Sequence, residues 1–179
     1  GALGSAGYVA GIERLGVPAI QETDASLGVA NLRDGDGATA LPCGLSLAAA
    51  WDEELAERAG AMIGAEARAK GFNVMLAGGA NLTREPRRGR NFEYLGEDPL
   101  LTGVLAGASI RGVQSNRIVS TMKHFALNAQ ETGRMSMDVT QLRGIRLLAG
   151  LADEELARVA ARLTLCDFLP ETVILSRAT

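Results

Sequence analysis

The fold of this chain is decided by residues 118–128, which read IVSTMKHFALN. The β-branched run at the start of this stretch predicts a buried strand. In a barrel of parallel strands and helices, the ligand site forms at the carboxyl ends of the strands, so polar side chains placed there point at a substrate. The candidates for such a role are Lys123, His124, Asn128 and Arg134. The alternative is that the only histidine of the chain is satisfied inside the core, with the lysine extending beside it.

The segments before this stretch alternate between helix and strand patterns. Residues 47–70 have the apolar spacing of an amphipathic helix, and 72–77 form the apolar run of a buried strand. A second helix is expected over 100–114 and a short strand over 18–21. The only tryptophan, Trp51, lies near the start of the first helix and is expected to pack against the core. This rhythm is typical of βα units and a parallel sheet, which predicts an α/β fold.

The composition bounds the function. With 179 residues, of which 47% are hydrophobic and 22% charged, the chain can bury the core of one domain. Its net charge of −3 gives no general attraction to nucleic acid or acidic membranes. No apolar run approaches the ~20 residues that cross a bilayer. Cys43 and Cys166 lack metal-ligand spacing and are expected to be free buried thiols. We therefore expect no metal, no cofactor, no nucleic-acid partner and no membrane.

The compartment and the oligomeric state stay open at this stage. The chain begins at Gly1 and shows no signal-peptide pattern, so any signal peptide is absent or already removed. A periplasmic or secreted location would require that such a peptide preceded the present first residue.

Asp24, which follows the short strand over 18–21, is the first candidate for ligand binding. A carboxylate there can accept two hydrogen bonds from neighbouring hydroxyl groups, and such charge-assisted bonds are strong. The alternative is a turn-forming aspartate, because Asp is common in turns.

The loop before the second helix holds further candidates. Arg90 is the first of them, because a guanidinium fork can bridge hydroxyl groups or a carboxylate, and Arg84 is the second. Glu93, Glu97 and Asp98 could form a set of paired carboxylates. We expect Glu97 and Asp98 instead to be the acidic start of the second helix.

Three separated motifs resemble, in order and spacing, the N-terminal domain of the family-three glycoside hydrolases, the β-glucosidase group. They are ETD at 22–24 followed by Gly28, GRNFEYLGEDP at 89–99, and KHF at 123–125. The resemblance covers residues 1–139 and implies a (β/α)8 barrel that hydrolyses terminal β-D-glucose with retention. It also implies that glucose is bound by five side chains: Asp24, Arg90, Lys123, His124 and Arg134.

The same resemblance implies two catalytic carboxyl groups that this chain does not contain. The family's nucleophile is an aspartate in a Ser-Asp-Trp motif on a later strand, and its general acid comes from another domain or an inserted loop. No Ser-Asp-Trp occurs in this sequence, so no catalytic residue is assigned. We expect a partial TIM-type barrel with about half of the eight strands. Its half site would hold glucose or a β-glucoside weakly without turnover. The alternative is a non-catalytic sugar-binding module.

Residues 140–179 depart from the hydrolase pattern. The run LRGIRLLAGLADEEL at 142–156 resembles the opening helices of a cyclic-nucleotide-binding domain, and FLPETVI at 168–174 resembles its first strand. We therefore expect a short, mainly helical tail. A fusion regulated by cyclic nucleotides is a further alternative.

Overall fold

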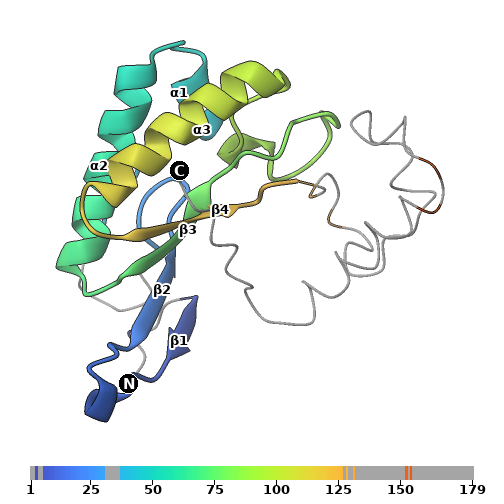
Figure 1. Cartoon of the computed structure of the whole chain (residues 1–179). Coiled ribbons are helices and arrows are strands. Elements are labelled where there is room, and N and C mark those ends of the chain that lie inside the picture. Colours follow the sequence, from blue (N-terminus) through green and yellow to red (C-terminus); the bar gives the residue numbers. More distant parts are fainter. Residues whose placement is uncertain are drawn as a thin grey trace.

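The computed structural model describes residues 3, 6–30, 37–126, 128, 131, 152 and 154. Strands and helices alternate along this part of the chain (Figure 1). The elements are, in order, β1 (Gly7–Val9), η1 (Glu13–Leu15), β2 (Ile20–Asp24), α1 (Gly44–Ala48), α2 (Glu53–Ala69), β3 (Val74–Gly78), η2 (Asn91–Glu93), α3 (Pro99–Gln114) and β4 (Val119–Lys123).

The four strands form one sheet in the order β1-β2-β3-β4. The first pair is antiparallel, whereas β2, β3 and β4 run parallel. Asp24 lies opposite Leu76 on β3, and Gly78 on β3 lies opposite Lys123. The carboxyl ends of the three parallel strands therefore meet at one edge of the sheet. This confirms the predicted α/β fold, with a sheet that is part of a barrel.

Helices α2 and α3 lie side by side on one face of the sheet (Figure 1). Each begins at an aspartate whose side chain accepts a backbone N–H. Asp52 accepts from Leu55 at 2.8 Å, and Asp98 accepts from Leu101 at 2.7 Å. Such caps satisfy donors that have no partner within the helix. The interpretation of Asp98 as a helix start is confirmed.

Glycines allow the backbones of α2 and α3 to touch. A Cβ atom on Gly60 would stand 2.2 Å from the backbone oxygen of Ser109, and one on Gly112 would stand 2.0 Å from that of Glu57. Neither position has room for a side chain. The two helices are therefore held closer together than any larger residue would permit.

The prediction of one continuous helix over residues 47–70 was wrong. The chain leaves helical geometry after α1, Trp51 takes a positive φ of 53°, and α2 starts afresh behind the Asp52 cap. The indole is 76% exposed, so the expected packing of Trp51 against the core was also wrong. Trp51 thus lies at the break between the two helices, and its side chain faces solvent instead of the core.

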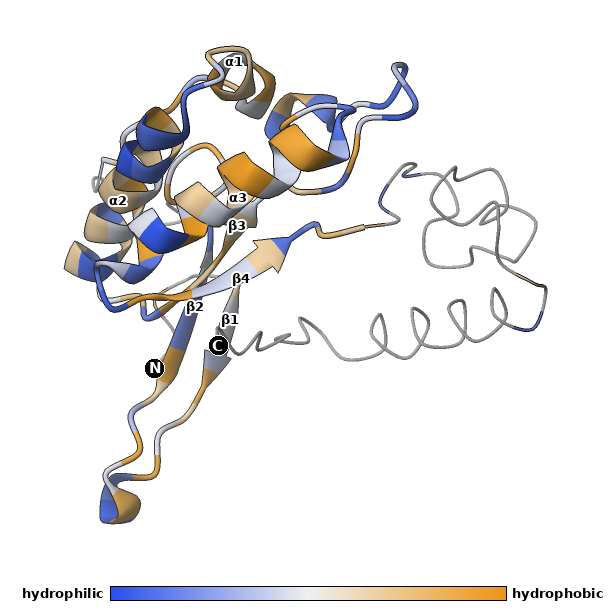
Figure 2. Cartoon of the chain, turned by 45° about the horizontal axis from the view of Figure 1, so that its top comes forward, coloured by the Kyte–Doolittle hydropathy of each residue, from blue (hydrophilic) through white to orange (hydrophobic). Residues whose placement is uncertain are grey.

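The core lies between the two helices and the sheet. Its buried members include Ile63, Met75 and Val113 in one cluster and Leu105 in a second. Figure 2 shows apolar residues along α3, and it shows the β1–β2 ribbon projecting away from the helices. Cys43 is a free thiol but only half-buried, so the expectation of a buried thiol was wrong for this residue. Cys166 lies outside the described residues.

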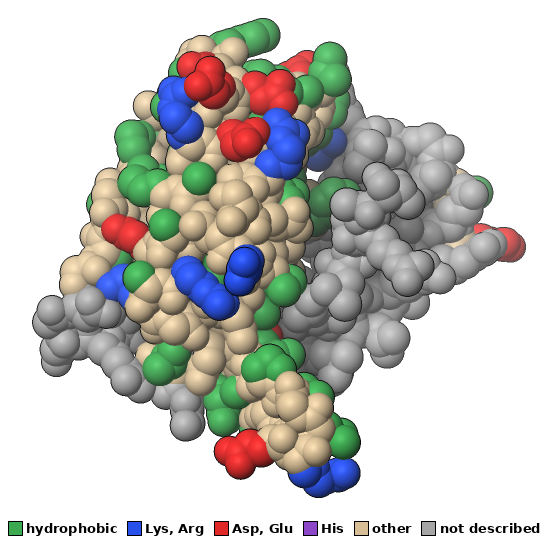
Figure 3. All heavy atoms as spheres, turned by 60° about the vertical axis from the view of Figure 1, so that its left-hand side comes forward, with side chains coloured by type: hydrophobic (Ala, Val, Ile, Leu, Met, Phe, Trp, Pro, Cys, Tyr) green, Lys and Arg blue, Asp and Glu red, His purple; other side chains and the backbone are tan. Residues whose placement is uncertain are grey.

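Charges on the surface are mixed in sign. The face drawn in Figure 3 carries acidic and basic side chains interspersed with one another. Among the described residues, every helix is too short or too polar to cross a membrane. The predicted helical tail over 140–179 lies outside the described residues, apart from residues 152 and 154.

Candidate functional site

An open hollow of about 480 Å³ lies at the carboxyl ends of the parallel strands. Its polar wall includes Asp24 from the end of β2, Lys123 from the end of β4, and Arg90 and Glu93 from the loop before α3. These groups come from three separate parts of the sequence. The parallel sheet brings them to one place, as the barrel geometry predicts.

Lys123 and Asp24 form an ion pair across this hollow. Lys123 Nζ donates to Asp24 Oδ1 at 2.9 Å, with 30% of the lysine and 51% of the aspartate side chain exposed. Both groups therefore remain accessible to a ligand. The ammonium has three donors and the carboxylate has two acceptor oxygens, so the pair leaves hydrogen-bonding capacity unused.

Arg90 stands beside the pair and holds a second carboxylate. Its Nε donates to Glu93 Oε1 at 2.5 Å, and its Nη1 lies 3.8 Å from Glu131 Oε1. Partial burial alone would lower the pKa of Arg90, but the hydrogen bond and charge of Glu93, with smaller contributions from Tyr94 and Glu131, raise it. The guanidinium therefore stays charged. Glu93, one of the carboxylates singled out in the sequence, serves here as the partner of Arg90.

His124 belongs to a neighbouring polar cluster and does not line the hollow. It follows Lys123 through a cis peptide bond. Its Nδ1 lies 2.9 Å from the hydroxyl oxygen of Tyr94, and that oxygen accepts hydrogen bonds from Asn128 Nδ2 at 2.8 Å and Arg88 Nη2 at 3.1 Å. Lys123 and His124 are adjacent in sequence but serve two different parts of the site.

Sequence reasoning missed two members of this cluster. Arg88 was not among the candidates, but its side chain is only 2% exposed and its guanidinium lies 4.8 Å from the centre of the Tyr94 ring. Tyr94 is completely buried. Its place inside the motif at 89–99 was the one available signal.

The predicted binding residues therefore divide into three groups. Asp24, Arg90 and Lys123 line one hollow, and His124 lies in the adjoining cluster. Arg134 lies outside the described residues. Arg84, the second arginine candidate, does not line the hollow.

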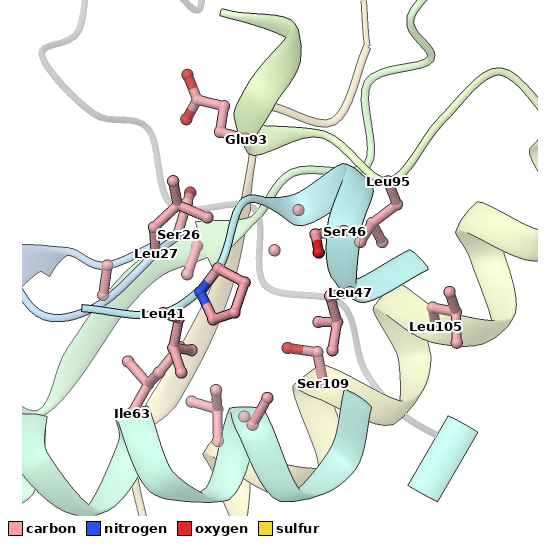
Figure 4. Close-up of a pocket in the computed structure, with 18 of the residues that line it drawn as sticks. Ser26, Leu27, Leu41, Ser46, Leu47, Ile63, Glu93, Leu95, Leu105 and Ser109 are labelled. Carbon is pink, nitrogen blue, oxygen red and sulfur yellow. The ribbon is translucent and has the colours of Figure 1, made fainter. Parts of the chain in front are cut away.

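A second, apolar cavity of about 260 Å³ shares a wall with the hollow (Figure 4). Ser26, Leu27 and Glu93 line both spaces. Figure 4 shows the Glu93 carboxylate turned away from the apolar side chains that fill the rest of the lining. The charged end of Glu93 therefore faces the polar hollow and not the apolar cavity.

The described residues contain no group of three or more His, Cys, Asp or Glu side chains placed to hold a metal ion. What the hollow offers is one exposed carboxylate, one ammonium and one guanidinium. Such a set of donors and acceptors is suited to a ligand that carries several hydroxyl groups.

The chain matches the glycosyl hydrolase family 3 N terminal domain over residues 7–147. It is 43% identical over 136 residues to thermostable beta-glucosidase B from Acetivibrio thermocellus, which covers 71% of this chain and 18% of that protein. A beta-glucosidase from Rhizobium radiobacter is 45% identical over 129 residues, which covers 70% of this chain and 16% of the relative.

Solved structures of the same group share the fold. Beta-glucosidase 3B from Thermotoga neapolitana in complex with α-D-glucose has a TM-score of 0.69 at 40% identity, over 74% of this chain and 19% of that one. DesR, a beta-glucosidase from Streptomyces venezuelae in complex with D-glucose, has a TM-score of 0.69 at 37% identity. The match covers 75% of this chain and 17% of DesR. The present chain thus spans less than a fifth of the length of these relatives.

The family match runs beyond the domain boundary expected after residue 139. The comparisons give no support to the resemblance of the C-terminal segment to a cyclic-nucleotide-binding domain. The β-glucosidase resemblance rested on motifs within residues 22–125, and there the comparisons agree with it. The chain therefore belongs to glycosyl hydrolase family 3, within the N-terminal barrel-type domain of that family.

Proposed function

We propose that this chain carries the glucose-binding half of a β-glucosidase site, formed by Asp24, Arg90, Lys123 and His124. The observation that supports this most directly is the Asp24–Lys123 ion pair, which lies in an open hollow at the carboxyl ends of parallel strands. Two solved relatives hold glucose. Arg134 is the fifth member of the proposed set.

The chemistry of these groups fits a sugar. The Asp24 carboxylate can accept hydrogen bonds from two adjacent hydroxyl groups, while the Lys123 ammonium and the Arg90 guanidinium can donate to hydroxyl oxygens. Hydrogen bonds to charged groups contribute about 1.5–3 kcal/mol each. Loss of one of them should therefore weaken binding by about tenfold to hundredfold.

In the whole protein the proposed activity is retaining hydrolysis of terminal β-D-glucosides. That reaction requires two carboxyl groups ~5 Å apart, one as nucleophile and one as acid and base. This sequence contains no Ser-Asp-Trp, the motif that carries the nucleophile in the family it resembles. For the 179-residue chain by itself, we therefore propose binding without turnover.

The test is a calorimetric titration of the full chain with glucose. We expect a dissociation constant on the order of millimolar. The Asp24→Asn and Lys123→Met variants should each lose at least tenfold in affinity, whereas Lys70→Met, the only other lysine in the chain, should bind as the parent does. Equal affinity in all four proteins would overturn the site. Hydrolysis of an aryl β-glucoside by the pure chain, abolished in Asp24→Asn, would overturn the absence of turnover.

A non-catalytic sugar-binding module is the second candidate, because the same hollow would serve it. One uninterrupted read of the source DNA, with the intact mass of the expressed chain, separates the two. Continuation past residue 140 into further strands and a Ser-Asp-Trp favours the enzyme. A genuine end without that motif favours the binding module.

A further inference from the structure

The buried hydroxyl of Tyr94 lies within hydrogen-bond distance of three side chains. Tyr94 Oη is 2.8 Å from Asn128 Nδ2, 3.1 Å from Arg88 Nη2 and 2.9 Å from His124 Nδ1. The tyrosine side chain has no exposed surface. Its hydrogen bonds are therefore made within the protein.

The donors and acceptors can be counted at this oxygen. A phenol oxygen carries one proton and accepts at two lone pairs. Arg88 can only donate, and Asn128 donates through its amide nitrogen, so these two residues occupy both lone pairs. The remaining contact, to His124 Nδ1, must then use the phenol proton. Burial raises the pKa of Tyr94, against a smaller opposing effect of Arg88, so the phenol keeps that proton at neutral pH.

An imidazole whose Nδ1 accepts a hydrogen bond carries its proton on Nε2. We propose that Arg88 and Tyr94 are positioning residues that hold His124 as the neutral Nε2–H tautomer. Nε2 has no exposed surface in this structure, so a ligand meets its N–H only after the side chains that cover it move, and the ligand atom would then be an acceptor such as a hydroxyl oxygen. This last step rests on the proposed glucose site, but the assignment of the tautomer does not.

The environment of Arg88 supports a positioning role. Its side chain is almost completely buried, and its Nε and Nη1 have no hydrogen-bond partner among the described residues. The contacts it does make are to the Tyr94 ring, the Tyr94 hydroxyl and Glu131 Oε1 at 3.4 Å. Burial of a cation with donors left unused is unfavourable. An apolar side chain would fill this position at lower cost, but it could not donate to Tyr94.

The single histidine makes the test direct. In uniformly ¹⁵N-labelled protein without sugar, a long-range ¹H–¹⁵N correlation spectrum at neutral pH contains imidazole signals from His124 alone. We expect the shifts of an unprotonated Nδ1 and a protonated Nε2. A protonated Nδ1 in the parent chain, with or without a proton on Nε2, would overturn the proposal, and this reading needs no variant to fold.

Two variants then assign the cause. Tyr94→Phe removes the hydroxyl, and Arg88→Met frees one lone pair of the phenol oxygen; each should shift the Nδ1 and Nε2 signals toward those of the Nδ1–H tautomer. Arg87→Met, the exposed neighbour, should leave both signals unchanged. Parent-like imidazole signals in folded Tyr94→Phe would also overturn the proposal.

Glucose binding provides a separate reading. We expect Tyr94→Phe to lose about threefold to tenfold in glucose affinity, the effect of one neutral hydrogen bond. If the parent binds no glucose while its histidine is the Nε2–H tautomer, the proposed function fails and the tautomer assignment stands. If the parent binds glucose with a protonated Nδ1, the proposed function stands and the assignment fails.

Discussion

Lys123 Nζ lies 2.9 Å from Asp24 Oδ1, although β3 separates the two strands that carry them. Adjacent strands are ~4.8 Å apart, so the backbones of β2 and β4 are separated by about twice that distance, and the two side chains must bridge it. A long lysine side chain can reach this far if the strand between carries little bulk. The residues of β3 that end at this edge are Ala77 and Gly78, and neither has a side chain longer than a methyl group.

The ion pair should matter for binding and very little for stability. Exposed pairs of this kind contribute about 0–1 kcal/mol. We expect a double-mutant cycle of Asp24→Asn and Lys123→Met, measured by urea unfolding, to give a coupling energy below about 1 kcal/mol. A coupling well above 2 kcal/mol would assign the pair to the architecture of the sheet instead of the ligand site.

The close contact between α2 and α3 should depend on Gly112. We expect Gly112→Ala to lower the free energy of unfolding by about 1–3 kcal/mol, because its Cβ would meet the Glu57 carbonyl. Gly103 lies on the same helix with open space around it, so Gly103→Ala is the matched control. That variant should be neutral or stabilise the chain by up to about 1 kcal/mol through higher helix propensity. Equal effects of the two variants in urea unfolding would refute the contact.

Trp51 should be replaceable by glycine with a gain in stability. Its φ of 53° is unfavourable for a residue with a Cβ, and its exposed indole contributes little packing. We expect Trp51→Gly to raise the free energy of unfolding by about 1 kcal/mol, measured by circular dichroism because the variant loses the only indole. Trp51→Ala keeps the unfavourable backbone and should show no such gain. A loss of stability in the glycine variant would mean that the indole packs after all.

Glu85 provides a prediction for pH. A side-chain hydrogen bond from Arg87, followed by the Arg87 backbone N–H and charge, lowers the pKa of Glu85 from 4.5 to about 2. Any stability that this pair contributes is therefore fully present above pH 4.5 and is lost as the pH falls toward 2. Carboxyl ¹³C titration should place the midpoint of Glu85 near 2, and Arg87→Met should move it toward 4.5. A midpoint near 4.5 in the parent chain would contradict the contact.

The periodic elements could be predicted from the sequence, because their signals are local. Asp98 followed by Pro99 marked the start of α3, the apolar run over 72–77 marked β3, and the β-branched run over 118–121 marked β4, each strand to within two residues at each end. The prediction that β4 is a buried strand was wrong in part, because Val119 is 43% exposed. The pairing of Asp24 with Lys123 followed only in outline, from the rule that carboxyl ends of parallel strands meet. The motif resemblance identified both residues as ligand groups without indicating that they touch.

What could not be predicted depends on backbone geometry and on contacts between distant residues. Nothing in the sequence around Trp51 signals a left-handed residue, since glycine or asparagine is the usual occupant of such a position. Arg88 reads as one of several surface arginines, because its burial results from the ring of Tyr94 and the approach of Glu131. The separation of His124 from Lys123 was equally hidden, because nothing in two adjacent residues indicates that only Lys123 lines the hollow.

The glycine contact between α2 and α3 also determines which amide protons exchange last with solvent. Helices whose backbones touch exclude water along their shared face, and they can separate only if the core beneath them opens as well. The β1–β2 ribbon has the opposite character, since Tyr8, Val9 and Leu15 are exposed along it. In native-state hydrogen exchange the ribbon would open by small local fluctuations, whereas α2 and α3 would exchange only through near-global unfolding. The proposed sugar site lies between the fast-exchanging ribbon and the slow-exchanging helices, because Asp24 is on β2, the strand that joins the ribbon to the core.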